Sequence, residues 1–125
     1  MIISLFCFII LLQVKHLLCD YVWQTPDMLR FKGIYGNSNG VLHSLYHGIG
    51  SMVCFLIAFP FSMISLGVVL MGIDILTHYH IDWVKVNYGC PHLSKPAFWV
   101  HLGLDQFAHQ FTYIVMIGLI VLMAY

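Results

Sequence analysis

Glutamate is absent from this 125-residue sequence, and charged residues of any kind are scarce. All five acidic residues are aspartates, five lysines and arginines balance them, and charged residues make up 8% of the chain. A water-soluble domain carries about 25% charged residues, so this chain cannot cover a water-facing surface. The balance also leaves no basic face for nucleic acid and no acidic tail, so we expect no nucleic-acid partner.

The sequence also has no disulfide framework and no signal-peptide pattern. Cys7, Cys19, Cys54 and Cys90 form no CxxC pair, and cysteine in apolar segments is usually a small buried hydrophobe. The first 18 residues lack both a basic start and a small-residue cleavage site. We therefore expect an uncleaved first helix.

Hydrophobic residues, by contrast, make up 61% of the chain, the mean hydropathy is +0.90, and the apolar residues fall into four long runs. A helix needs about 20 apolar residues to cross a bilayer. The predicted spans, all in one domain, are about residues 1–23, 41–59, 61–84 and 97–124. Thr25 and Pro26 are typical of a new short helix over 26–31, and Pro60 indicates a tight connection. The predicted fold is an all-α integral membrane protein, an up-down-up-down bundle of four transmembrane helices.

Eight histidines outnumber the residues of either charge, and most belong to pairs of polar residues four positions apart. Residues four apart share one helix face, and ionisable groups at membrane depth are costly enough to indicate function. The pairs are His16/Asp20, His43/His47, His78/Asp82 and Asp105/His109. They come late in the first and third spans and early in the second and fourth. Four alternating helices therefore bring all four pairs to one membrane face.

These five imidazoles and three carboxylates predict a metal site. Di-metal bundles collect inward-facing ligands from four helices at similar spacings, and this donor set suits zinc, iron or manganese rather than calcium. Eight ligands exceed the need of one tetrahedral zinc. With three carboxylates, one divalent ion leaves a charge of −1 and two leave +1, which one hydroxide neutralises. The sequence favours two divalent ions; a hydrogen-bonded network without metal is the alternative.

Other polar residues of the spans have simpler interpretations. Three histidines are expected to lie at the membrane interface or to face away from the pairs: His80, His92 and His101. Asp74 shares the helix face of His78 and is either a deeper ligand or a group that orients one. Gln24 and Gln106 are amides that could orient ligands.

The basic residues predict the orientation in the membrane. All of them lie at the end of the spans that carries the pairs: Lys15, Arg30, Lys32, Lys85 and Lys95. By the positive-inside rule this face is cytoplasmic and both termini are external. Trp23, Trp83 and Trp99 fall at the same level, as expected for an aromatic belt.

Four stretches resemble the sequence blocks of a small phage and bacterial membrane-protein family, domain of unknown function 3307. These stretches are residues 16–24, 43–47, 78–85 and 105–109. The resemblance covers nearly the whole chain in the right order and implies a bacterial inner membrane or a phage-associated membrane, without implying an activity. A looser similarity to the YdjM-like inner-membrane metal-dependent hydrolases, which carry His and Asp on membrane helices, implies hydrolysis.

Two functions remain open at this point. The first is a metal-dependent hydrolase of a lipid phosphate or related ester, with activated water as the nucleophile and Arg30, Lys32 and Lys85 attracting the head group. The second is a non-catalytic membrane protein, or a subunit of a larger membrane assembly, whose metal site is structural. A catalytic site keeps an open coordination position, and eight protein ligands favour a closed one. The HxxHH boxes of membrane desaturases are absent, and these pairs suit bis-histidine haem poorly.

Overall fold

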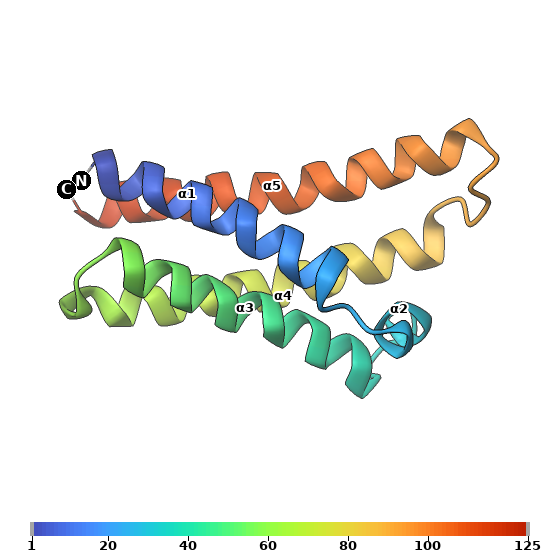
Figure 1. Cartoon of the computed structure of the whole chain (residues 1–125), viewed down its shortest axis with the longest axis horizontal. Helices are drawn as coiled ribbons and strands as arrows, with labels where there is room; N and C mark the ends of the chain where they lie inside the picture. Colours follow the sequence, from blue (N-terminus) through green and yellow to red (C-terminus); the bar gives the residue numbers. More distant parts are fainter. Residues whose placement is uncertain (1, 125) are drawn as a thin grey trace.

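The computed structural model describes residues 2–124 and is a bundle of four long helices (Figure 1). Its elements are α1 (Ile2–Leu17), the π-helical turn η1 (Leu18–Val22), α2 (Pro26–Phe31), α3 (Ser38–Ala58), the 3-10 turn η2 (Phe61–Met63), α4 (Ile64–Tyr88) and α5 (Pro96–Ala124). No strand occurs among the described residues, and the all-α prediction is confirmed. Four segments are long and apolar enough to cross a membrane: Ile2–Val22, Ser38–Ala58, Phe61–Tyr88 and Pro96–Met123.

The helices extend beyond the apolar runs at their polar ends. Asn37 begins α3 earlier than predicted, because its side-chain oxygen accepts a hydrogen bond from the Asn39 backbone N–H at 2.9 Å. Thr25 caps α2 as predicted, with its hydroxyl accepting from the Met28 N–H at 3.2 Å. Met1, which the first predicted span included, lies outside the described residues. Hydropathy therefore located the spans but not the polar turns at their ends.

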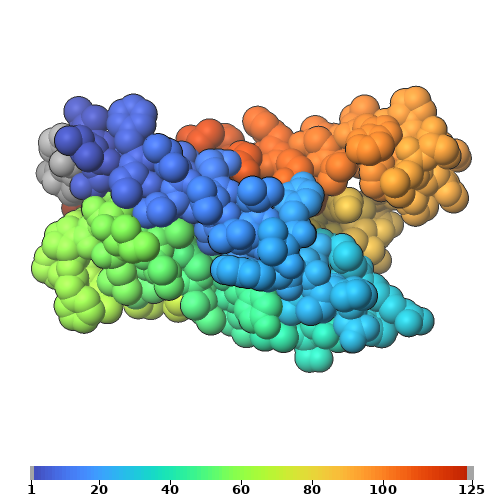
Figure 2. Space-filling model, in the orientation of Figure 1, coloured from blue at the N-terminus to red at the C-terminus, as the bar shows by residue number. Residues whose placement is uncertain are grey.

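The four helices alternate in direction, as an up-down-up-down bundle requires. Contacts join α1 to α3, α3 to α4, and α4 to α5, and α1 also touches α5. Figure 2 shows α1 and α3 side by side on one face of the molecule. The chain ends and the Pro60 connection lie at one end of the bundle, with α2 and the α4–α5 connection at the other (Figure 1).

The interior is divided into an apolar half and a polar half. The apolar half, toward the chain ends, is a cluster that includes Phe8, Phe55, Leu70 and Ile120, with Phe8 edge-on to Phe55 at 5.9 Å between ring centroids. The outer surface carries many exposed large apolar side chains, which indicates contact with lipid because water would disfavour such a surface. The polar half holds the paired histidines and aspartates.

Gly48 allows α3 and α4 to approach closely beside the polar half. A Cβ at Gly48 would overlap the side chain of Ile75 and lie 3.0 Å from the Met71 carbonyl oxygen. Gly48→Ala is expected to lower the free energy of unfolding by about 1–3 kcal/mol through overpacking, measured by detergent-denaturant titration of the circular dichroism. Gly103→Ala is the control, because a Cβ there meets no atom within 4 Å. Equal stabilities of the two variants would contradict this packing.

Candidate metal centre

All eight paired residues are brought to one level of the bundle interior. Seven of them are buried: His16, His43, His47, His78, Asp82, Asp105 and His109. Asp20 is half-buried. Within the described chain, metal-ligand atoms converge in two groups, the first made of Asp20, His43, His47 and His78 and the second of His78, Asp82 and His109.

The first group gathers three imidazoles around one carboxylate oxygen. Asp20 Oδ1 lies 3.0 Å from His47 Nε2, 3.1 Å from His43 Nε2 and 3.6 Å from His78 Nε2. The Nε2 atoms of His43 and His78 are 3.1 Å apart. Zinc–ligand bonds of about 2.0–2.1 Å place the corners of a coordination tetrahedron about 3.3 Å apart. The spacing of the first group fits one tetrahedral ion.

The polar atoms around His43 are more crowded than hydrogen bonds can explain. Besides Asp20 and His78, its Nε2 lies 3.0 Å from the Gln24 amide and 3.3 Å from Asp82 Oδ2. A ring nitrogen of neutral imidazole either donates one hydrogen bond or accepts one. His43 Nε2 can therefore form a hydrogen bond with one of these neighbours. A cation shared by several of these atoms would satisfy them together.

The π-helical turn η1 carries Asp20 toward these histidines. The Trp23 N–H donates to the Leu18 carbonyl at 2.8 Å, which closes a turn one residue wider than an α-helical turn. Single π turns inside helices occur frequently at functional sites. His16 remains close to the same carboxylate, with its Nε2 3.2 Å from Asp20 Oδ2. Sequence spacing predicted the pair but not the π turn.

The second group is looser and contains unsatisfied atoms. His109 Nε2 lies 3.9 Å from Asp82 Oδ1 and 3.7 Å from Asp105 Oδ1. In and beside the two groups, five buried atoms have no hydrogen-bond partner within the described chain: His43 Nδ1, His78 Nδ1, Asp82 Oδ2, Asp105 Oδ1 and His109 Nε2. Leaving buried polar atoms unpaired costs about 1–3 kcal/mol each, which points to a missing ion, water or substrate. His78 belongs to both groups, and its Nε2 lies 3.6 Å from Asp20 Oδ1 and 3.4 Å from Asp82 Oδ2.

His16 and Asp105 were predicted as ligands but lie outside both groups of the described chain. His16 Nδ1 faces the Tyr113 hydroxyl, and His16 Nε2 faces Gln106 Oε1, each at 3.0 Å. The Gln106 amide also donates to Asp105 Oδ2 at 3.1 Å. Gln106 therefore bridges the two residues, and its role in orienting metal ligands stays a prediction.

Lys15 is buried inside the bundle, a position that the sequence did not reveal. It was counted among the bases of the membrane face, yet it is 5% exposed. Its ammonium donates to Asp74 Oδ2 at 2.7 Å and to the Tyr113 hydroxyl at 2.9 Å, and lies 3.4 Å from His47 Nδ1. Asp74 also accepts from the Ser51 hydroxyl at 2.6 Å. An aspartate inside a membrane span needs a partner. The position of Asp74 within the third span was therefore the one sequence feature that could have indicated a buried lysine.

Lys32 is also paired inside the bundle rather than free for a head group. Its ammonium lies 3.0 Å from Asp82 Oδ1. The Gln24 amide satisfies its neighbours when its oxygen faces His43. In this orientation the oxygen also accepts a hydrogen bond from the Lys32 ammonium at 3.2 Å. Lys32 therefore neutralises Asp82, and only Arg30 and Lys85 remain of the bases predicted to attract a head group.

The histidines outside the pairs lie outside the centre, as predicted. His80 is exposed, with its ring facing the Leu76 carbonyl and the Tyr35 hydroxyl. His101 accepts from the Cys90 N–H at 2.7 Å. His92 is exposed in the α4–α5 connection.

A polar cavity of about 330 Å³ adjoins the centre. Its lining includes three aspartates and two lysines: Asp20, Asp82, Asp105, Lys32 and Lys85. Asp105, whose Oδ1 atom has no hydrogen-bond partner within the described chain, is part of this lining. The centre is therefore bordered by space that a small polar group can enter.

The fold and this centre define a class, a membrane-spanning four-helix bundle with a His/Asp cluster that could hold a metal ion. The chain belongs to the family described as protein of unknown function (DUF3307), whose model matches residues 7–124. No curated protein and no solved structure matches it. The family expected from the sequence is confirmed, and the looser similarity to metal-dependent hydrolases stays a prediction.

Proposed function

We propose that the protein binds a divalent metal ion through Asp20, His43, His47 and His78 and uses it to hydrolyse a phosphate ester of a membrane lipid. The observation that carries the proposal is that four of the six spacings among these ligand atoms are 3.0–3.6 Å and that all six are within 4.8 Å. They match a coordination tetrahedron, and hydrogen bonds alone cannot satisfy them. Three imidazoles and one carboxylate suit zinc, and iron or manganese next.

The buried charges favour one ion rather than the two expected from the sequence. Four aspartates and two lysines lie within the polar half: Asp20, Asp74, Asp82, Asp105, Lys15 and Lys32. Their net charge is −2, which one divalent ion neutralises. Two ions would leave +2 in a medium of low dielectric constant, where uncompensated charge is costly. The charge sum made from the sequence favours two ions because it leaves out Lys15 and Lys32, which were expected at the membrane face.

Four protein ligands fill a tetrahedron, so hydrolysis requires a fifth coordination position, of the kind that catalytic zinc gains when it expands to five-coordinate. The polar cavity supports such a position, because Asp20 of the ligand set belongs to its lining. A bound divalent ion would polarise the phosphoryl oxygen and activate water. In hydrolysis the water oxygen forms a bond to phosphorus, the bond from phosphorus to the lipid oxygen breaks, and that oxygen takes up a proton. Asp105 is placed to accept the proton from water, with His109 Nε2 3.7 Å away.

The end of the bundle that carries the site is proposed to face the cytoplasm of a bacterial or phage-associated membrane. Lys15 and Lys32 no longer count as surface bases. Arg30, Lys85 and Lys95 still lie at this end, and the positive-inside rule makes such an end cytoplasmic. The proposed partner is therefore a lipid of the inner leaflet.

Purified protein is expected to contain about one equivalent of divalent metal per chain, as one tetrahedral site requires, measured by mass spectrometry of the metal. Replacement by cobalt(II) should give the intense visible bands of tetrahedral coordination. The protein should release inorganic phosphate from phosphatidic acid in mixed micelles, lose this activity with a chelator and regain it with the ion. Protein without metal would contradict the site. Metal-loaded protein that releases no phosphate would contradict the hydrolase and support a structural metal.

A further inference from the structure

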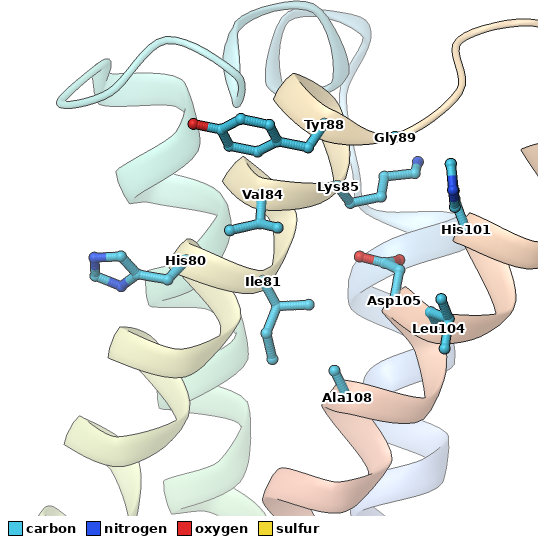
Figure 3. A pocket seen from close by; sticks show the side chains of 10 residues that line it. All are labelled: His80, Ile81, Val84, Lys85, Tyr88, Gly89, His101, Leu104, Asp105 and Ala108. Atoms are coloured by element: carbon cyan, nitrogen blue, oxygen red, sulfur yellow. The ribbon is translucent and has the colours of Figure 1, made fainter.

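An apolar cavity of about 370 Å³ lies beside the polar one, between the end of α4 and the start of α5 (Figure 3). Its walls include Ile81 and Val84 of α4 and Leu104 and Ala108 of α5. Figure 3 shows Ile81 of α4 and Ala108 of α5 beside the space between the two helices. The volume is within the range of small-molecule sites, about 300–1,000 Å³.

Lys85 and Asp105 join the two cavities. Both residues line the apolar cavity and the polar one. Figure 3 shows the Lys85 side chain extending from α4 toward His101, and the Asp105 carboxylate extending from α5 toward α4. A ligand that filled both cavities would therefore have an apolar end and a polar end, with Lys85 at the junction.

We propose that the apolar cavity binds an acyl chain of an anionic phospholipid whose phosphate lies at Lys85 in the polar cavity. This inference rests on the proposed function and deepens it by naming the substrate class. Val84 is 49% exposed and Leu104 61% exposed, so the walls of the cavity reach the outer, lipid-facing surface. A chain can therefore enter sideways from the bilayer.

The charges at the junction select an anionic head group. Three aspartates and two lysines of the polar cavity sum to −1, and one divalent ion changes this to +1. Lys32 is occupied by Asp82 at 3.0 Å, whereas Lys85 makes no ion pair or hydrogen bond within residues 2–124. Lys85 is therefore the cation available to a phosphate. A choline head group would bring a second cation toward it.

The test uses phosphatidic acid with a diazirine in one acyl chain, photo-crosslinked to the metal-loaded protein in lipid nanodiscs. Peptide mapping is expected to place the label within residues 80–108. Phosphatidylcholine with the same photoreactive chain should label this region about tenfold less. This ratio corresponds to a difference of about 1.4 kcal/mol in binding free energy between the two lipids. Excess inorganic phosphate should compete poorly, because it lacks the chain.

Two variants separate the contributions of head group and chain. Lys85→Gln should reduce labelling by phosphatidic acid to the level of phosphatidylcholine, whereas Lys95→Gln, at an exposed lysine, should change nothing. Ala108→Trp fills the cavity and should abolish labelling by both lipids. Ala97→Trp is the matched control at an exposed position of α5. Circular dichroism of each variant tests its folding.

Label spread over α1 and α3, or equal labelling by the two lipids, would overturn the inference. The metal content of the same samples separates it from the proposed function. Metal-loaded protein without label in this region overturns the lipid site alone. Selective label on a protein that binds no metal overturns the metal-dependent hydrolase alone.

Discussion

Replacing His78 with alanine is expected to abolish metal binding. His78 belongs to both groups of candidate ligands, and the residue is fully buried. Loss of a group that merely orients a ligand weakens metal affinity about 10–100-fold, so loss of a ligand should weaken it more than about 100-fold. The affinity is measured by competition with a chelating dye, and phosphate release should fall with it.

His80→Ala is the matched control for this substitution. It removes an imidazole from the same helix two residues away, at an exposed position, and should leave the metal affinity unchanged. His78→Gln keeps most of the side-chain volume and should also lose the metal, which separates ligand loss from a packing defect. Retention of metal by both His78 variants would exclude the first group as the site.

Replacing Lys15 with methionine is expected to destabilise the protein by about 3–5 kcal/mol, the typical cost of breaking a buried ion pair. The Asp74 carboxylate, 2.7 Å from the ammonium, would remain buried without a cation. Methionine keeps the apolar stem that packs on Gly50, where a Cβ would lie 2.6 Å from Lys15 Cγ. The measurement is the free energy of unfolding in mixed micelles.

A double-mutant cycle tests whether the loss arises from the ion pair. Asp74→Asn removes the buried negative charge, so the double variant Lys15→Met/Asp74→Asn should recover much of the stability lost by Lys15→Met. Lys95→Met removes an exposed lysine and should change the stability by less than about 0.5 kcal/mol. Simple addition of the two single effects would contradict the pairing.

The spans and the convergence of the four pairs followed from the sequence because both depend on short-range patterns. Apolar length fixes which segments can cross a bilayer, and a spacing of four places two side chains on one helix face. Alternating helices then bring late and early pairs to the same level. These arguments located His16, His43, His78 and His109 without knowledge of how the helices are rotated.

The buried lysines and the π turn could not be predicted, because they depend on contacts between helices. A lysine side chain is long enough to reach either the head groups or the interior from the same level of a helix. Lys15 is buried because the rotation of α4 brings Asp74 to it. Similarly, Leu18–Val22 has no local signal for a π turn. The turn forms where Asp20 meets three histidines from two other helices.

The helices of this bundle differ in length, and the difference matters in a bilayer. The α3 span has 21 residues and the α5 span 28, which correspond to about 32 Å and 42 Å at 1.5 Å per residue. A hydrocarbon layer of about 30 Å matches α3, whereas α5 exceeds it. Figure 1 shows the joined ends of α4 and α5 reaching beyond η1. Hydrophobic mismatch is therefore concentrated where the apolar cavity lies, so the thickness of the host membrane determines whether its opening meets acyl chains or head groups.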